Sequence, residues 1–460
     1  MKSWLANADP ETAWEHLAWP EFPAAGSSQS PLVILPLHGF VDRGAAHAID
    51  AEEVIASRIL RAAVGRLKAV ALLCVLPPIR QVLAAKAGGF FGLDPETAYD
   101  QLMGICRGVR DSGCTKIVLL NSSAISASLA ASVALDARAE FGLYTYLIQA
   151  ADLGVDFTSG DAPLEAPTSL LVELLGEILA HRSPASSIPA SPATPNAPSE
   201  PADCFPSAYR DRYLGGFTPD KLRACATSGN ALAVLPIAAI EQHGLHLPVG
   251  VDAILGQALL SGALASLPGH APVFVAPPLI YGKSNEHAGF PGTLSIDTKT
   301  LRRTLLAAAD QIARLDFRRL AIFNTHGGNN HVLEITLREI RENLGLAAFR
   351  LRAGYQPDLD PQEQAWGMHA DEWETSLMLA CAPEWVRMDK AVCEYPSRLG
   401  DPGHLRIEKA PATFAWLTKD ISTSGVLGNP TRATAENGRR WLSEASSTLG
   451  RRLEHALSGA

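Results

Sequence analysis

The sequence predicts an α/β protein made of two units, each with a mainly parallel sheet covered by helices. Short apolar runs alternate with helical stretches through residues 231–351, and parallel strands need such crossovers. The chain has 460 residues, of which 47% are hydrophobic and 19% charged, enough for two or three domain cores. A third observation is a stretch near the middle that divides the chain.

The dividing stretch, Ser183–Ala202, reads SPASSIPASPATPNAPSEPA. A composition dominated by Pro, Ala and Ser cannot bury a core and favours extended, polyproline-like backbone. We therefore predict a linker at 183–204 between an N-terminal domain at 1–182 and a C-terminal domain at 205–460.

The C-terminal part alternates regularly between strands and helices. Short apolar runs bounded by turn residues predict strands, and apolar residues at helical spacing predict helices. Asp297 or Thr298 is the expected N-cap of the second long helix. The expected strands are Ala231–Pro236, Pro272–Ala276, Arg319–Phe323 and Ala347–Leu351, and the expected helices are Ala253–Leu267, Thr298–Ala313 and His331–Leu344.

The two halves of the chain resemble each other. Ile34–Leu37 matches Val234–Ile237, and Val75–Pro78 matches Val275–Pro278, both at an offset of 200 residues. Later matches follow in the same order at slightly larger offsets, as differences in loop length would produce. We therefore predict a tandem duplication.

Composition and charge exclude several classes of protein. The net charge is −9 and the sequence pI is 5.8, whereas a nucleic-acid binder needs a basic face. The longest apolar stretches, such as 69–76, are too short to span a bilayer, and the N-terminus lacks a signal-peptide core. The seven cysteines form no C-x-x-C pair, which is typical of reduced thiols. We expect a cytoplasmic protein with no nucleic-acid or membrane partner.

The stretch Ile237–Asp252 carries the first candidate ligands. It places Glu241, His243, His246 and Asp252 directly after an expected strand, where open α/β sheets hold their sites. Side chains two residues apart on an extended segment leave the same face. Carboxylates with imidazoles are suited to zinc, manganese or iron. Taken alone, the stretch is equally compatible with a polar loop.

Two loops containing glycine follow. Ser284–Thr293 carries Glu286 and His287, which could bind metal or substrate, and we favour a structural or substrate-lining role. Asn324–Asn330 follows a strand and precedes a helix, so His326 is well placed as a ligand. The alternative is an anion-binding loop at a helix N-terminus, but it lacks the lysine of a nucleotide-binding P-loop.

The last candidate segment is His369–Ser376. If Asp371 starts a helix, Glu374 lies in its first turn, where the helix dipole favours a carboxylate. His369 and Glu372 lie close by in the sequence. On its own, this segment is also typical of an acidic helix N-terminus at the surface.

Together the four segments resemble the creatininase family of metal-dependent amidohydrolases. The family blocks E-x-H-G-x-H-x-P-x-G-x-D, S-x-E-H-x-x-F-P-G-T, N-x-H-G-G-N and H-A-x-x-x-E-T-S all occur here in order. A tail at Gly425–Pro430 also resembles the family, which usually has Asp where Asn429 stands. The resemblance covers about 230–440 strongly and about 30–180 weakly. It implies three-layer α/β/α domains, an assembly that is usually hexameric, and two divalent metal ions.

Carried over motif by motif, the resemblance implies a set of metal ligands in which Asp252 bridges. Zinc is the first choice of metal, with manganese or iron as alternatives. Creatinine-cleaving members have Tyr-Glu after the third-block histidine, where this chain has Gly327–Gly328. This departure argues against creatinine itself as substrate and suggests that Glu374 completes the site. The implied ligands are Glu241, His243, Asp252, His326 and Glu374.

The implied chemistry is attack by metal-bound hydroxide on an amide or formamide carbon. The leaving nitrogen needs a proton, for which His369 is the first candidate and Glu372 the second. Trp366 and Trp373 could form walls for a planar substrate, although core packing is equally expected of them. Ser284 and His287 are also expected to line the substrate site.

The N-terminal copy keeps the apolar frame and loses nearly all these residues. We therefore predict a degenerate domain kept for assembly or substrate shaping. The aligned pairs are Glu241 with Val41, His243 with Arg43, Asp252 with Glu52, His326 with Ser123, and Glu374 with Pro167.

The predicted function is metal-dependent hydrolysis of a C–N bond in a small cyclic amide or formamide. One alternative is a peptidase that trims a ribosomally made precursor peptide, since the family includes such members. Another is a non-catalytic assembly protein. By analogy with hexameric single-domain relatives, we expect a homo-oligomer, in which three chains could form a pseudo-hexamer.

Overall fold

The computed structural model describes residues 12–23, 30–67, 72–83, 89–157, 163–181, 207–226, 229–396, 405–406 and 412–458. The predicted linker at 183–204 lies outside these residues. Among the helices of the described stretches, none is both long enough and apolar enough to cross a bilayer.

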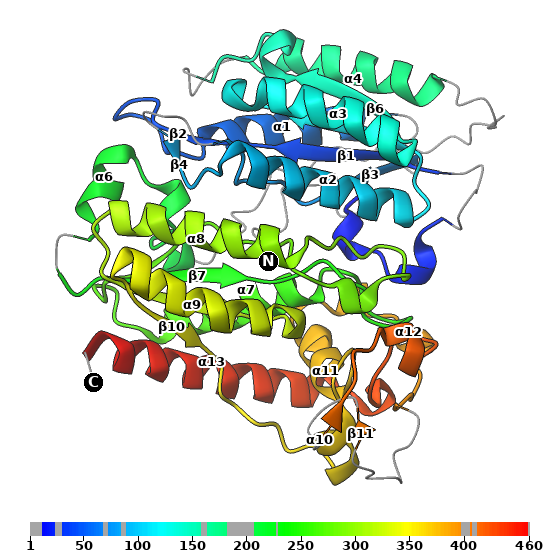
Figure 1. The fold of residues 1–460 in the computed structure, drawn as a ribbon, viewed down its shortest axis with the longest axis vertical. Helices are drawn as coiled ribbons and strands as arrows, with labels where there is room; N and C mark the ends of the chain where they lie inside the picture. The colour runs from blue at the N-terminus through cyan, green and yellow to red at the C-terminus, as the bar shows by residue number, and fades with distance from the viewer. Residues whose placement is uncertain are drawn as a thin grey trace.

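Two four-stranded parallel sheets form the framework of the chain (Figure 1). Their strands are β1 (Leu32–Leu37), β3 (Leu73–Val75), β5 (Lys116–Asn121), β6 (Tyr144–Gln149), β7 (Leu232–Ile237), β8 (Val273–Val275), β9 (Arg319–Asn324) and β10 (Ala347–Leu351). The first sheet has the order β3-β1-β5-β6 and the second the equivalent order β8-β7-β9-β10. All neighbouring pairs are parallel. The shared order confirms the predicted α/β class and supports the duplication.

Helices cover both faces of each sheet, which gives two three-layer α/β/α units. The long helices are α1 (Ala51–Arg66), α2 (Pro95–Asp111), α3 (Ala127–Phe141), α4 (Glu165–Ala180), α7 (Val251–Ser266), α8 (Thr298–Arg314), α9 (Asn330–Leu344), α11 (Glu372–Cys381) and α13 (Ala435–Ser458). In the first unit α1 contacts α4 and α2 contacts α3, and in the second α8 contacts α9 while α7 and α11 contact α13. The short elements are α5 (Ser207–Arg210), α6 (Pro219–Ala224), α10 (Pro361–Trp366), α12 (Thr418–Ile421), β2 (Phe40–Val41), β4 (Gly89–Phe90), β11 (Leu405–Arg406) and β12 (Ala412–Thr413).

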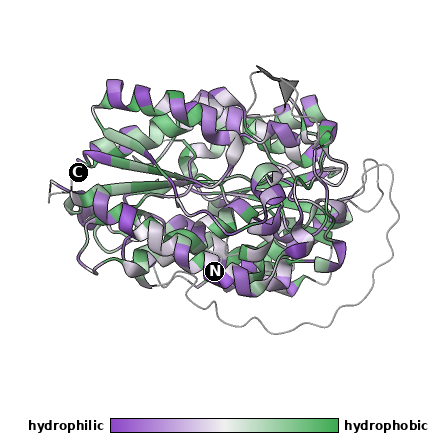
Figure 2. Cartoon of the chain, turned by 90° about the horizontal axis from the view of Figure 1, so that it is seen from below, coloured by the Kyte–Doolittle hydropathy of each residue, from purple (hydrophilic) through white to green (hydrophobic). Residues whose placement is uncertain are grey.

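Strand β1 shows how the sequence builds these layers. All of its residues are buried, as expected for a parallel strand between two helix layers. Leu32 and Ile34 pack with α1 and α4, whereas Val33 and Leu35 belong to the core on the opposite face. Figure 2 shows the same division, with hydrophobic residues concentrated along the sheets and hydrophilic residues on the outer helix faces.

One hydrophobic core runs through both halves of the chain. Helix α2 of the first half contacts α8 of the second (Figure 1). Gly108 on α2 allows close approach, because a Cβ there would lie 3.0 Å from the Thr293 carbonyl oxygen and 2.8 Å from Leu294 Cδ2. The two halves therefore form a single packed body.

The halves also exchange short segments reciprocally. Segment 12–22 first pairs with its own sheet and then crosses to the other half, where Leu17 O accepts from Val249 N at 2.9 Å. The equivalent segment 212–222 crosses the other way, and Phe217 O accepts from Ile49 N at 3.1 Å. The two contacts are related by the 200-residue offset. The chain is thus arranged as a dimer of copies within one polypeptide.

The predicted elements agree with the structure apart from small shifts at their ends. The helix expected at Ala253–Leu267 runs from Val251 to Ser266, and the strand expected at Ala231–Pro236 runs from Leu232 to Ile237. Asp297 is the N-cap of α8, and its side chain accepts a hydrogen bond from Thr300 N at 2.7 Å.

Candidate functional site

The candidate site lies at the carboxyl ends of the adjacent strands β7 and β9. The loop after β7 carries Glu241 and His243, and it is closed by a hydrogen bond from Glu241 N to Val249 O at 3.0 Å. Gly244 turns this loop with a φ of +70°, which favours glycine. Asp252 follows in the first turn of α7.

The remaining predicted ligands come from two other segments. His326 follows β9 directly, before the helix α9. Asp371 is the N-cap of α11 and accepts a hydrogen bond from Glu374 N at 3.0 Å, so Glu374 lies in the first turn as predicted. Sequence-distant segments therefore deliver imidazoles and carboxylates to one place.

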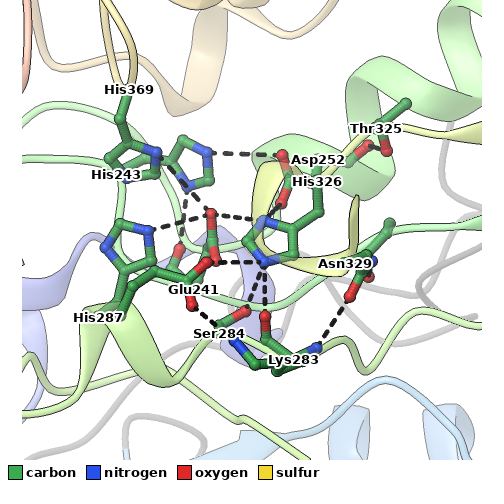
Figure 3. Close-up of polar contacts among 12 residues, drawn as sticks. Glu241, His243, Asp252, Lys283, Ser284, His287, Thr325, His326, Asn329 and His369 are labelled. Carbon is green, nitrogen blue, oxygen red and sulfur yellow. Dashed lines mark hydrogen bonds and ion pairs between the residues drawn. The ribbon is translucent and has the colours of Figure 1, made fainter. Parts of the chain in front are cut away.

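Figure 3 shows four of the five predicted ligands, Glu241, His243, Asp252 and His326, pointing toward one another. His326 Nδ1 lies 3.1 Å from Glu241 Oε1 and 3.4 Å from Asp252 Oδ2. His243 Nε2 lies 3.7 Å from Asp252 Oδ1 and 3.8 Å from Glu374 Oε2. Asp252 thus directs one oxygen toward each histidine, as a carboxylate between two cations would.

Several of these atoms are buried without a hydrogen-bond partner among the described residues. They are Glu241 Oε2, His243 Nε2 and Asp252 Oδ2. Buried polar atoms are normally bonded, so a missing ion is the simplest way to satisfy them. Glu241, His243 and Asp252 offer ligand atoms that all lie within 4.8 Å of one another. The residues present therefore fit divalent metal ions.

Backbone carbonyl groups orient three histidines. His243 Nδ1 donates to Glu241 O at 3.0 Å, and His326 Nε2 donates to Lys283 O at 2.9 Å. His369 Nε2 donates to Gln242 O at 2.7 Å. In each ring the other nitrogen faces the cluster, where it can bind a metal or a proton.

His287 is oriented the opposite way. The Gln242 side chain accepts from Gly244 N at 2.8 Å, so its amide nitrogen must be the atom that donates to His287 Nδ1 at 2.9 Å. Thr418 Oγ1 also lies 2.9 Å from this nitrogen. His287 Nε2 therefore carries the ring proton and faces Glu241 Oε1 at 3.5 Å. His287 positions that carboxylate.

The pKa shifts reflect a buried site rich in carboxylates. Burial lowers the pKa of His243, but Asp252 and Glu374 outweigh it and raise the pKa to about 9. Burial raises the pKa of Glu374 to about 8, with His243 opposing and Asp371 and Asp252 reinforcing the shift. Burial, helped by neighbouring histidines, holds the pKa of His369 well below its ordinary value. Glu374 therefore needs additional positive charge nearby to ionise at neutral pH.

Glu286 is a further carboxylate, which the sequence offered as a possible metal or substrate ligand while favouring a structural or substrate-lining role. Its Oε1 lies 3.4 Å from His326 Nε2, and it forms a possible ligand group with Glu241 and His326. Gly328 makes room for it, because a Cβ at Gly328 would lie 1.9 Å from Glu286 Oε1. The sequence signals of this arrangement are Glu286 itself in the S-x-E-H block and the second glycine of the N-x-H-G-G-N block.

The cluster lines a cavity of about 840 Å³. One part of its wall is basic, formed by Lys283, Arg350 and Arg352. Another part is apolar and includes Phe414 and Trp416. Because these residues belong to no recognisable motif and come from separate segments, the sequence did not predict them.

Four other predicted residues lie elsewhere. The Ser284 hydroxyl is 3.3 Å from His326 Nε2, behind the ring rather than on the cavity wall. Glu372 Oε2 lies 3.9 Å from Arg432 Nε and does not line the cavity. Trp366 is half-buried in α10, also outside the cavity lining.

The fourth, Trp373, packs in the core instead of against the main cavity. Its ring centroid lies 5.8 Å from that of Tyr355 and 5.6 Å from that of Trp441. It also borders a smaller cavity beside Asp252 and Glu374. Helix periodicity explains this result, since Glu374 and Trp373 are adjacent and therefore leave α11 in different directions.

The N-terminal counterpart of the site holds an ion pair. Arg43, aligned with His243, places Nη2 2.5 Å from Oε1 of Glu52, which is aligned with Asp252. Gly39 N also donates to Glu52 at 3.2 Å. A guanidinium attached to the chain thus supplies the positive charge that metal ions would supply in the other half.

Comparisons with known proteins agree with this architecture. A family model for creatininase, described as creatinine amidohydrolase, matches residues 15–169 and 217–453. The chain belongs to the creatininase family. The two matched segments, together with the repeated strand order, support the tandem duplication.

Several creatininase-family proteins can be aligned with this chain. The mycofactocin precursor peptide peptidase of Mycolicibacterium smegmatis is 33% identical over 215 residues, 46% of this chain and 80% of that protein. The creatinine amidohydrolase of Pseudomonas putida is 32% identical over 206 residues, 40% of this chain and 77% of that protein. A crystal structure of creatinine amidohydrolase covers 53% of this chain and 97% of its own, with 25% identity and a TM-score of 0.43. This creatininase-family chain is a hydrolase acting on carbon–nitrogen bonds.

Proposed function

We propose that the C-terminal half binds two divalent metal ions and uses them to hydrolyse an amide bond. The observation that carries this proposal is the group of buried ligand atoms that have no hydrogen-bond partner, within the described stretches, beside a large cavity. Glu241, His326 and Asp252 would hold one ion, and His243, Glu374 and Asp252 the other. When bound, such ions lower the pKa of a water molecule and polarise the substrate carbonyl. The donor set suits zinc, manganese or iron.

His369 is the proposed proton carrier. Its Nδ1 faces the cluster, 3.8 Å from Glu241 Oε1, and its low pKa keeps this nitrogen free to accept a proton. Nδ1 can take the proton of the attacking water and pass it to the leaving nitrogen. The hydrogen bond from Nε2 to Gln242 O holds the ring and stabilises its charged form. Glu372 is less suited, because its carboxylate lies beside Arg432.

The proposed substrate is a small cyclic amide or a formamide. A precursor peptide is the second candidate, favoured by the similarity to the mycofactocin precursor peptide peptidase. A cavity of about 840 Å³ is larger than a small cyclic amide requires, which also favours the peptide.

The N-terminal half is proposed to be a degenerate copy that supports the catalytic half. Trp14 Nε1 donates to Gly292 O at 3.1 Å, and Ser112 Oγ accepts from Gly292 N at 2.8 Å. Both contacts fix the loop that carries Glu286 and His287. The proposed domain limits at 1–182 and 205–460 therefore divide the sequence into two copies, but the two copies pack against each other.

Metal analysis of the purified protein tests the proposal. We expect about two divalent ions per chain in the wild type and in His270→Ala, which changes an exposed histidine outside the cavity. Glu241→Gln and His326→Ala should lose metal and amidase activity together. A wild-type protein that binds no metal and cleaves no amide after addition of zinc, manganese or iron would favour the non-catalytic assembly protein instead.

A further inference from the structure

Two arginines stand side by side on the cavity wall. Arg350 lies in the edge strand β10 and Arg352 directly follows its end, and both side chains line the cavity. Neither forms an ion pair with a carboxylate among the described residues, whereas Arg302 in the same half pairs with Glu339 at 2.8 Å. Adjacent like charges are unfavourable unless something binds between or beside them.

Arg350 is held in place by uncharged groups. Its Nη2 donates to Asn330 Oδ1, while its Nε is buried with no hydrogen-bond partner in the part of the chain that the structure describes. Asn324 Nδ2 donates both to Asn330 Oδ1, at 3.0 Å, and to His326 O, at 2.6 Å. This chain of hydrogen bonds ties the guanidinium to the turn that carries a proposed metal ligand. The arginine is therefore fixed close to the reacting groups.

The other charges on this wall leave the arginines available. Lys283 Nζ lies 3.6 Å from Glu286 Oε2, so it is partly neutralised. Glu334 also lines the cavity and attracts Arg350, but it forms no ion pair with it in the described part of the chain. Burial and the neighbouring Arg352 outweigh Glu334 and lower the pKa of Arg350. An anion from solution would relieve this repulsion.

We propose that Arg350 and Arg352, assisted by Lys283, bind a carboxylate of the substrate beside the amide bond to be cleaved. A planar guanidinium pairs with a carboxylate through two parallel hydrogen bonds, which fixes the orientation as well as the position of the substrate. The apolar part of the lining, with Met368, Phe414 and Trp416, suits an apolar or aromatic group of the same substrate. Water adds to the carbonyl carbon, the C–N bond breaks, and the products are an acid and an amine.

The cleavage of an amide bond in this inference rests on the proposed function, whereas the binding of a carboxylate by the two arginines does not. The required carboxylate can be the free C-terminus of a peptide or the acid group of a small N-acylated amino acid. Both share the same chemistry at the arginines. They are distinguished by which series of substrates the enzyme cleaves.

The first test measures binding without turnover. 3-Phenylpropanoic acid and its amide, neither of which has an amide bond at the position to be cleaved, are titrated by calorimetry into the protein as isolated. The acid should bind roughly 10- to 100-fold more tightly, since hydrogen bonds between charged groups are worth that much. Arg350→Gln and Arg352→Gln should remove most of this preference. Arg341→Gln, an exposed arginine on α9 outside the cavity, should keep it.

Two results of the binding test would overturn the proposal. One is equal binding of the acid and the amide by the wild type. The other is a preference for the acid that survives in both arginine variants, because the carboxylate would then bind elsewhere, such as on the metals.

The second test measures turnover of matched substrates with a free or an amidated carboxyl group. Faster cleavage of the free acids, lost in Arg350→Gln, supports the proposal, and the peptide and small-molecule series show which source is used. Equal cleavage of both forms would refute the carboxylate site and leave the hydrolase intact. A protein without metal or activity would refute the hydrolase, while the calorimetric comparison, made on the protein as isolated, would still decide the carboxylate site.

Discussion

Replacing Gly328 with alanine should disrupt the metal centre while leaving the fold intact. The added Cβ would lie 1.9 Å from Glu286 Oε1, 2.5 Å from His326 Nε2 and 2.5 Å from Lys283 O. Ordinary contact requires about 3.4 Å or more, so at least one of these groups must move by about 1 Å. A displacement of that size at a reacting centre costs roughly 100-fold in rate. We expect reduced metal content and a comparable loss of amidase activity.

The neighbouring glycine provides a matched control. A Cβ at Gly327 would meet no atom within 4 Å among the described residues, so Gly327→Ala should retain metal and activity. Metal content is measured by mass spectrometry, activity with the best amide substrate, and folding by thermal unfolding. A Gly328→Ala protein with full metal and wild-type activity would show that the Glu286 and His326 positions are not fixed as described.

Two further predictions concern charge. His243, with a pKa of about 9, and Glu374, with a pKa of about 8, hold protons at neutral pH before metal binds. A binding metal ion must displace these protons, so the affinity of the protein for metal should rise as the pH rises to about 9. The increase should be up to about tenfold per pH unit for each proton displaced. Competition with a chelator at several pH values measures this, and a pH-independent affinity would contradict it. Arg43→Met should leave Glu52 buried without its cation and destabilise the protein by roughly 2–4 kcal/mol in urea unfolding, without changing metal content. Arg107→Met removes an exposed pair with Glu140 and should cost less than about 1 kcal/mol, and equal effects of the two changes would refute the importance of burial.

The sequence predicts features that depend on local pattern. Strand β7 is recognisable from its apolar run, and α8 from Asp297 followed by apolar residues at helical spacing. Glu241, His243 and Asp252 lie within one short stretch of the chain, so the pattern of residues alone indicates that they share a site. The structure brings these predicted ligands together.

The features that could not be predicted depend on contacts between distant segments. Arg350 and Trp416 reach the same cavity from parts of the chain that carry no motif. The importance of Glu286 depends on the absence of a side chain at Gly328, which only the packed geometry reveals. Trp373 is expected from its sequence either at the substrate or in the core, and its packing against Trp441 decides for the core.

The reciprocal exchange of segments 12–22 and 212–222 has a consequence for how the two copies can change over time. In a dimer of separate identical subunits, a substitution in the site alters both sites at once. Joined in one chain, the copies mutate independently, and the first could lose its histidines while the second kept them. The first copy must keep the surface that contacts the second copy, including Leu17 and Trp14. If the first copy is degenerate as proposed, its constraints come from an internal interface rather than from a reaction.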